Sequence, residues 1–304
     1  MMTSLEIGPE IGPAVEGIME RRGRRTWFGV VGEMAGDRAP VIVCHGGPGM
    51  THDYLLPVAD LVGRGHACVF YDQFGNGRSG HRPDAPADFW TVELFVDELA
   101  ALIEHVSPPD GYHLLGHSWG GMLALELAAR RPEGLRSIVV ADAFASSADY
   151  LDGVAGLVAG LPADVRSTIE EHEAAGTTES PEYQRAVRAF YGRHVCRARP
   201  VPDEVMRTMA ALAGDPTVYT TMAGPSEFHM TGPLKDWTIA DRLHLVDVPV
   251  LLISGRYDEV TPGAVEPLRR GLPDARWELF EESSHMPHIE ERDRFTDLVA
   301  AFLR

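Results

Sequence analysis

The sequence predicts an α/β fold, a mostly parallel central sheet flanked by helices, with a helical segment inserted into it. Short apolar runs alternate with helical stretches in the first half and the last fifth of the chain, which is typical of strands buried between two layers of helices. A serine between two glycines stands where one apolar run ends and a helix begins. Residues 143–241 break the alternation, with helical patterning, repeated prolines and few β-rich runs.

The expected elements follow the chain in order. We expect strands at residues 24–31, 41–44, 67–71, 112–115, 137–141, 248–255 and 276–280. We expect helices near residues 52–62, 91–106, 122–131 and 295–303. The helix at 91–106 is the clearest, because its large apolar residues gather on one side at helical spacing.

The interruption sets the domain organisation. A structureless loop of about a hundred residues is rare in a compact domain. We therefore expect residues 144–240 to form a helical cap, or lid, that is inserted between core strands and lies over the active site. Residues 1–143 and 241–304 then form the core.

Ser118 is the first candidate for chemistry. It is the centre of a Gly-His-Ser-Trp-Gly pentapeptide over residues 116–120, directly between an apolar run and a helical one. A tight strand-to-helix turn lifts a serine hydroxyl clear of its own backbone, and flanking glycines remove the Cβ atoms that would clash there. The context indicates a nucleophile.

A serine nucleophile needs a general base, and the base needs an orienting carboxylate. For a serine in this kind of turn, the expected order along the chain is serine, acid, histidine. Asp258 follows the strand at 248–255, and His285 follows the strand at 276–280. We assign Asp258 as the orienting acid, with Glu259 as its rival, and His285 as the base. His288 is expected to face solvent or cap a helix.

The loop after the strand at 41–44 supplies the expected oxyanion hole. It reads His-Gly-Gly-Pro-Gly over residues 45–49. In this arrangement the hole is made by the N–H group after the nucleophile and one from this loop, which here are those of Trp119 and Gly47.

Composition excludes several classes of function. The 304 residues carry a formal net charge of −18 at pH 7, which argues against nucleic acids and anionic membranes as partners. Hydrophobic residues make up 44% and charged residues 24%, as in ordinary globular proteins. We expect no cofactor and no metal. The sequence sets no oligomeric state.

The three cysteines and the first residues bear on location. The cysteines show no disulfide spacing, which fits a reducing compartment. Residues 1–17 lack a basic segment followed by an apolar one, so no secretory signal is expected. No apolar stretch is long enough to cross a bilayer. We expect a cytoplasmic protein.

Several motifs together resemble a known group, the α/β-hydrolase fold, and within it the proline iminopeptidase family with its related L-amino-acid amidases. The resemblance spans nearly the whole chain. It rests on the motifs at residues 45–49, 71–79, 116–121, 224–228, 257–262 and 284–288. It implies a serine hydrolase that cleaves the amide bond after an N-terminal residue with a free amine, through an acyl-enzyme. The implied substrate is a small molecule or a short peptide.

In that family, acidic residues from the cap and from the loop of the catalytic acid bind the substrate's free amine. The matching positions are Glu227 and Glu259, and Tyr219 is a further candidate for substrate binding. Two departures bear on this. His117 stands where many members have glycine and is expected to reshape the pocket, and Arg256, if it points inward, works against an ammonium.

Two other functions stay open at the level of sequence. One is an esterase, lactonase or biosynthetic tailoring hydrolase that uses the same triad without amine recognition, because this fold hosts many reactions. The other is a protein of the same fold that binds a ligand without converting it to product. The first alternative predicts turnover that does not depend on a free amine. The second predicts ligand binding without product from any amide or ester.

Overall fold

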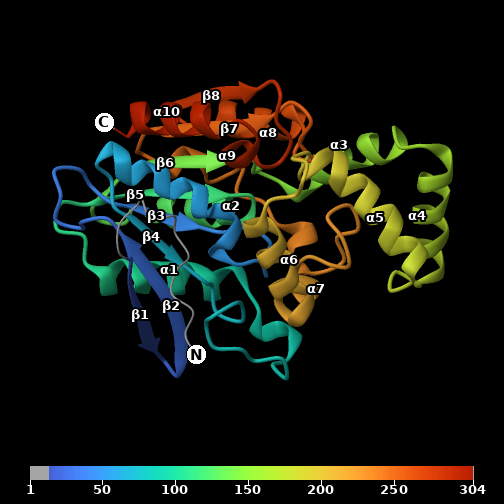
Figure 1. The fold of residues 1–304 in the computed structure, drawn as a ribbon, viewed down its shortest axis with the longest axis horizontal. Coiled ribbons are helices and arrows are strands. Elements are labelled where there is room, and N and C mark those ends of the chain that lie inside the picture. Colours follow the sequence, from blue (N-terminus) through green and yellow to red (C-terminus); the bar gives the residue numbers. More distant parts are fainter. Residues whose placement is uncertain (1–13, 304) are drawn as a thin grey trace.

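An eight-stranded sheet runs through the protein, in the order β1-β2-β4-β3-β5-β6-β7-β8 (Figure 1). The structure is a computed structural model that describes residues 14–303. The six strands from β4 to β8 in that order pair in parallel, whereas β1 and β2 join the sheet antiparallel. The strands are β1 (Ala14–Arg21), β2 (Arg24–Val31), β3 (Val41–Cys44), β4 (Cys68–Tyr71), β5 (Tyr112–His117), β6 (Leu135–Ala141), β7 (Val250–Gly255) and β8 (Ala275–Phe280). The predicted fold class is confirmed.

Helices cover both faces of the sheet. The core helices are α1 (Val92–Val106), α2 (Trp119–Ala128), α8 (Pro262–Gly271), α9 (Pro287–Glu290) and α10 (Arg292–Phe302), with the 3-10 helix η1 (His52–Arg64). Shorter 3-10 turns are η2 (Ala87–Phe89), η3 (Pro233–Asp236) and η4 (Leu243–Leu245). The helix expected near residues 52–62 is thus a 3-10 helix, and it contains Pro57, which lacks the N–H group that an α-helix interior needs.

The core lies in two layers because consecutive strand residues point to opposite faces. Ile42, Leu114 and Leu252 pack with α1, α2 and α8 on one face. Val43 and Leu251 pack with η1 and α10 on the other. Burial on both faces explains why these strands read as continuous apolar runs rather than alternating ones.

The first strand was not predicted. β1 pairs with β2 in an antiparallel hairpin, with Ala14 opposite Val31. Its sequence mixes charged residues and Gly17 with apolar ones, so it lacks the apolar run that marks the inner strands. The expectation of no secretory signal concerns residues 1–17, of which residues 1–13 lie outside the described part.

Five α-helices lie between β6 and β7 and extend to one side of the sheet (Figure 1). They are α3 (Ser147–Ala159), α4 (Ala163–Ala175), α5 (Pro181–His194), α6 (Asp203–Gly214) and α7 (Thr217–Met222). Helix α6 packs on η1, where Arg207 pairs with Asp53 at 3.0 Å and Thr208 contacts Thr51 at 2.5 Å. These contacts hold the inserted helices against the carboxyl edge of the sheet.

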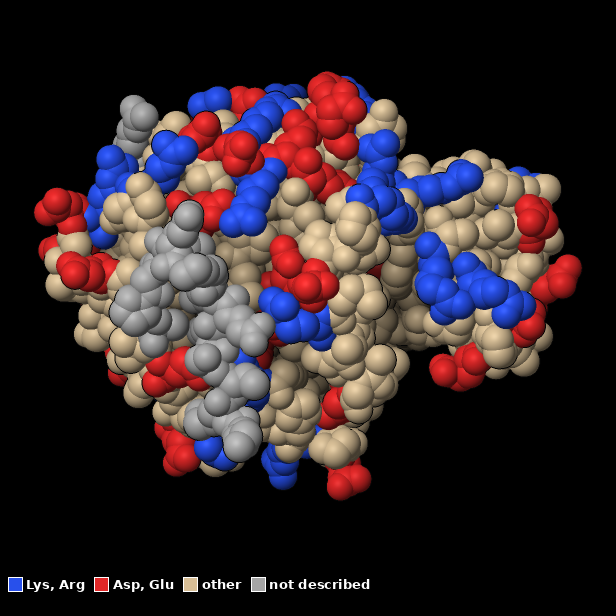
Figure 2. Space-filling model, in the orientation of Figure 1, with Lys and Arg blue, Asp and Glu red and all other residues tan. Residues whose placement is uncertain are grey.

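The surface carries both signs of charge. Acidic and basic side chains are interspersed on the face shown in Figure 2, over the sheet domain and over the inserted helices alike. In the part of the chain that the structure describes, no helix has both the length and the apolar character needed to span a membrane.

Candidate active site

Ser118 stands in a strained turn between β5 and α2. Its backbone has φ 55° and ψ −123°, a conformation that is costly for a residue with a side chain. The Ser118 N–H donates to the carbonyl of Ala141 at 2.8 Å. A Cβ atom at Gly116 would lie 2.2 Å from the Gly120 carbonyl, and one at Gly120 would lie 2.0 Å from the Cys44 carbonyl. The two glycines therefore let the turn pack closely enough to present the hydroxyl.

His285 and Asp258 meet at the same edge of the sheet. They lie in the loops after β8 and β7, both buried, with His285 Nδ1 2.7 Å from Asp258 Oδ1. The same Asp258 oxygen accepts the Val260 N–H at 2.9 Å, which fixes the carboxyl group. Burial lowers the pKa of His285, but the Asp258 charge and hydrogen bond outweigh it, so this pKa lies above its ordinary value.

Ser118 and His285 line one cavity of about 360 Å³ together with Gly47, Glu227 and Glu259. The structure thus brings the predicted nucleophile, base and amine-binding residues together. Within residues 14–303 the Ser118 hydroxyl makes no hydrogen bond to His285. Catalytic hydrogen bonds are often long in substrate-free sites and tighten when substrate binds.

The glycine loop lies against the serine turn as expected for an oxyanion hole. Gly47 has φ 114°, and a Cβ atom there would lie 2.4 Å from the Gly49 nitrogen, so no other residue fits this conformation. Among the described residues, neither the Gly47 nor the Trp119 N–H group has an acceptor. Both donors line or adjoin the cavity and remain available to a ligand oxygen.

Gln73, to which the sequence reasoning gave no role, connects the two segments of the candidate oxyanion hole. Its side-chain oxygen accepts the Trp119 indole N–H at 2.8 Å, and its amide nitrogen donates to the His45 carbonyl at 2.8 Å. Its backbone N–H donates to His45 Nε2 at 2.9 Å. Gln73, which belongs to the motif at residues 71–79, therefore links the glycine loop to the start of α2.

A second link runs through Tyr54 and His117. The Gly46 N–H donates to the Tyr54 hydroxyl at 2.8 Å, and that hydroxyl lies 2.8 Å from His117 Nδ1. His117 Nε2 lies 2.6 Å from the carbonyl oxygen of His285. His117 does line the cavity, as expected, but it also links the glycine loop to the backbone of the base.

His288 is not at the surface as predicted. It is 1% exposed, its Nε2 donates to the Tyr54 carbonyl at 3.1 Å, and its ring packs on those of Tyr54 and His117. Burial lowers its pKa to about 3. The prediction was wrong because the helix start that suggested a cap, α9, lies inside the fold between the β8 loop and η1.

Glu227, which is half-buried, and Glu259, which is buried, form a pair of carboxyl groups beside the proposed base. Glu259 Oε1 lies 3.7 Å from His285 Nε2, and Glu259 Oε2 has no hydrogen-bond partner among the described residues. Tyr219 donates to Glu227 Oε1 at 2.7 Å, and the Tyr150 hydroxyl holds the Glu227 carbonyl at 3.0 Å. Burial raises the pKa of Glu227, and burial with the charges of Glu227 and Asp258 raises that of Glu259 well above its ordinary value.

Arg256 does not point into the site. Its guanidinium pairs with Glu281 at 2.7 and 2.8 Å, and its side chain is 45% exposed. Arg256 would oppose an ammonium only if it pointed inward. It lies instead at the surface, and its positive charge is paired with Glu281.

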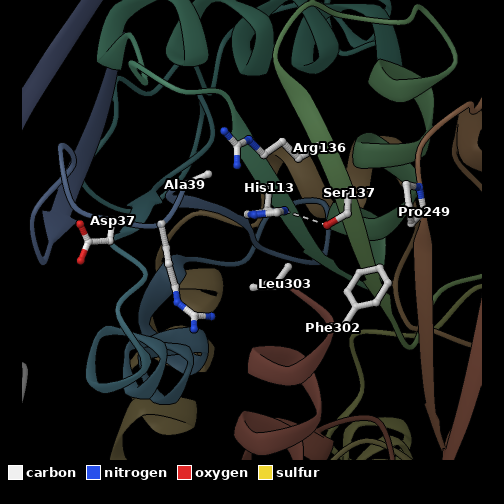
Figure 3. Close-up of a pocket in the computed structure, with 9 residues that line it drawn as sticks. Asp37, Ala39, His113, Arg136, Ser137, Pro249, Phe302 and Leu303 are labelled. Carbon is white, nitrogen blue, oxygen red and sulfur yellow. Dashed lines mark hydrogen bonds between the residues drawn. The ribbon is translucent and has the colours of Figure 1, made fainter.

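A second cavity, of about 380 Å³, lies at the other end of the sheet (Figure 3). Its wall includes His113, which contacts Ser137 at 2.8 Å, at the amino ends of β5 and β6. Ser118 follows the carboxyl end of β5, so this cavity is remote from the nucleophile. In the described residues, the one group of three side chains with metal-ligand spacing is Asp142, Asp258 and His285, which overlaps the candidate triad.

Comparison with known proteins places this geometry in context. Residues 39–292 match the alpha/beta hydrolase fold family. The chain is 36% identical to the proline iminopeptidase of Saccharolobus solfataricus over 88% of this chain and 86% of the relative. It is also 36% identical to that of Lactobacillus delbrueckii subsp. lactis, over 92% and 94% of the two chains.

Two solved structures are similar over nearly their whole length. The proline iminopeptidase of Mycobacterium smegmatis superposes with a TM-score of 0.88 and 43% identity, over 95% of this chain and 97% of that one. The crystal structure of VinJ superposes with a TM-score of 0.93 and 48% identity, over 95% and 98%. The inserted helices are included in these spans, so the likeness extends beyond the sheet.

Proposed function

Since the chain belongs to the alpha/beta hydrolase fold family, and within it to the proline iminopeptidase family, we propose that it hydrolyses the amide bond after an N-terminal residue with a free amine. It is a serine hydrolase. The proposed substrate is a short peptide or an amino-acid amide, and the proposed location is the cytoplasm, which the three buried free cysteines fit.

The observation that carries the proposal is the pair of carboxyl groups next to the base. A substrate's α-amine is two bonds from the scissile carbonyl carbon, so its anchor must lie close to the serine and histidine. Glu227 and Glu259 line the same cavity as Ser118 and His285. A buried ammonium needs charged hydrogen-bond partners, and the free Oε2 of Glu259 is an acceptor without a donor.

Tyr219 supports this role indirectly. Its hydroxyl holds one oxygen of Glu227 and leaves the other free to accept from an amine. An ammonium between the two carboxyl groups would oppose the effect of burial, which raises both pKa values, because a nearby positive charge favours the ionised form. The proposed substrate thus supplies a positive charge beside the two carboxyl groups.

The reaction follows from the positions of the groups. Ser118 Oγ attacks the carbonyl carbon while His285 Nε2 takes its proton, and Asp258 holds Nδ1–H so that the imidazolium is stabilised. The N–H groups of Gly47 and Trp119 donate to the developing oxyanion. His285 then protonates the leaving amine, and water hydrolyses the acyl-enzyme by the reverse proton movements.

Turnover of three matched substrates tests the proposal. They are proline-β-naphthylamide, its N-acetyl derivative and a p-nitrophenyl ester. We expect cleavage of the free-amine amide and not of the acetylated one. Ser118→Ala should abolish turnover of all three without unfolding the protein.

Substitution at the clamp refines the test. Glu227→Gln leaves a buried ammonium with one charged partner, which costs about 2 kcal/mol or more, so kcat/KM for the free-amine substrate should fall about 30-fold or more. The ester should change little. Glu171→Gln, at an exposed position on α4, is the control. Equal cleavage of the free and acetylated amides by the unmodified protein would contradict amine recognition and leave the serine hydrolase assignment intact.

A further inference from the structure

A third carboxyl group, that of Asp142, lies behind the proposed triad. Asp142 is the residue after β6, which pairs in parallel with β7, with Ala141 opposite Ile253. Its N–H donates to the Ile253 carbonyl at 2.8 Å. Because the two strands end side by side, Asp142 faces the loop that carries Asp258.

Asp142 is held rigidly in this position. It is fully buried and has φ 54°, a strained conformation for a residue with a side chain. Its Oδ1 accepts the Gly255 N–H at 3.1 Å. One side-chain atom each of Asp142, Asp258 and His285 lie within 4.8 Å of one another.

Each of the two aspartates has one carboxyl oxygen without a hydrogen-bond partner among the described residues. These oxygens, Oδ2 of Asp142 and Oδ2 of Asp258, are both buried and have no donor within residues 14–303, although side-chain oxygens of the two residues lie within 4.8 Å of each other. Two ionised carboxylates offer only acceptors and repel each other. A single proton on one of them turns it into a donor to the other, and both oxygens are then satisfied.

The surroundings favour the protonated form of Asp142. Burial, then the Asp258 charge, raises the pKa of Asp142 well above its ordinary value, and Glu290 on α9 adds a further negative charge. The one basic group that faces it from β5 is His117, whose Nε2 is 3.7 Å from Asp142 Oδ2. That distance is too long for a hydrogen bond.

His117 does not supply a positive charge. Burial, followed by the proximity of His285 and His288, lowers its pKa well below the ordinary value. Its contacts agree: Tyr54 accepts the Gly46 N–H and has His117 Nδ1 as the acceptor for its own proton, so Nδ1 carries none. The proton on Nε2 goes to the His285 carbonyl.

We propose that Asp142 is protonated and donates a hydrogen bond to Asp258 Oδ2, so that it acts as a positioning residue for the triad acid. The proposal deepens the proposed function, because it rests on Asp258 being that acid. Asp258 then binds Asp142 through one oxygen and His285 through the other. The proton of Asp142 stays within the pair during turnover, and the proton taken from Ser118 passes to His285 and the leaving amine.

Two substitutions at Asp142 separate a donor from a negative charge. Asp142→Asn keeps a neutral donor and the acceptor for Gly255, as a protonated aspartate does. Asp142→Ala removes both. We expect kcat of the alanine variant to fall about 10- to 100-fold, as expected for loss of orientation at a reacting group, with KM little changed. The asparagine variant should retain at least tenfold more kcat than the alanine variant.

The pH at which kcat/KM falls on the acidic side of its profile (the acid limb) shows whether Asp142 is neutral or negatively charged. Without the donor, Asp258 binds a proton more strongly and stabilises the His285 imidazolium better, so Asp142→Ala should move the limb to higher pH. If Asp142 were ionised, either substitution would delete a negative charge about 5 Å from His285 and lower its pKa by about 2 units. A downward shift in both variants overturns the proposal.

An infrared difference spectrum tests the proton without reference to activity. At neutral pH, the spectrum of the unmodified protein minus that of Asp142→Asn should show the carbonyl stretch of a protonated carboxyl group. The control Asp84→Asn, in an exposed loop, should keep this band. Its absence refutes the proposal even if the enzyme is active. Presence of the band in a protein that fails to discriminate free from acetylated amides would refute the proposed function alone. If Asp142→Ala fails to fold, the asparagine variant and this spectrum still decide.

Discussion

Replacement of Tyr54 by phenylalanine removes one hydroxyl on which two buried groups depend. The Gly46 N–H donates to this hydroxyl, and the hydroxyl serves His117 Nδ1, each at 2.8 Å. The ring itself stays, so no cavity larger than the lost oxygen forms. Each buried group left without a partner costs about 1–3 kcal/mol. With two such groups, the expected loss in free energy of unfolding is about 2–6 kcal/mol.

The same change should reduce catalysis, because Gly46 adjoins the Gly47 donor and His117 holds the backbone of His285. Removal of one oxyanion donor costs about 3–4 kcal/mol in known cases, and Tyr54→Phe only loosens one. We expect kcat to fall about tenfold, which is less than the fall expected from complete loss of the donor.

Tyr112→Phe is the matched control. Tyr112 is 2% exposed and its hydroxyl has no hydrogen-bond partner among the described residues, so its removal orphans nothing. Urea denaturation of both variants gives the two free energies of unfolding. We expect Tyr112→Phe to equal or exceed the unmodified protein in stability. Equal losses in the two variants would show that the Tyr54 hydroxyl carries no hydrogen-bond network, and the reasoning would fail.

Three further predictions rest on single groups. The proposed base works in its neutral form, and the pKa of His285 is raised above 6.5. We therefore expect kcat/KM for the ester to fall as pH falls through a value above 6.5. A fall that begins only below pH 6.5 contradicts this. Burial raises the pKa of Glu98 from 4.5 to about 7, so its folded form holds a proton that the unfolded chain releases, and stability should fall as pH rises between these values. Glu98→Gln should remove about 3 kcal/mol of that fall, which denaturation at several pH values measures; an unchanged slope argues against it. Gly120→Ala places a Cβ atom 2.0 Å from the Cys44 carbonyl and should cost at least about 3 kcal/mol, seen as a lower Tm, whereas an unchanged Tm would exclude the close packing of the turn.

The inner strands and the order of the proposed site residues could be predicted because each has a local signal. Strands buried on both faces leave continuous apolar runs, and loops at their carboxyl ends hold Ser118, Asp258 and His285 in the expected order. β1 could not be predicted in this way, because an edge strand need not be apolar. The assignment of the site residues and the cap boundaries at 144 and 240 stay predictions.

The supporting residues were missed because their partners are distant in sequence. Asp142 follows a strand just as Asp258 does, and only the register of β6 against β7 shows that they meet. Gln73 lay in a motif that was recognised but had no assigned partner until His45 and Trp119 were seen beside it. Arg256 was considered near the amine site, and only its ion pair with Glu281 shows where it points.

The charges around the cavity favour a ligand with a positive charge. Asp258, Glu227 and Glu290 all raise the pKa of His285, and no lysine or arginine of the described chain lines its cavity. Asp258 already has His285 as a partner. A proton on Asp142 would leave the two aspartates with one negative charge between them. Glu227 and Glu259 have no lysine or arginine beside them among the described residues that line the cavity, so a substrate cation is needed to stabilise the two negative charges together. A neutral ester or a carboxylate does not meet that need, whereas the ammonium of an N-terminal residue does, at the position from which its carbonyl reaches the serine.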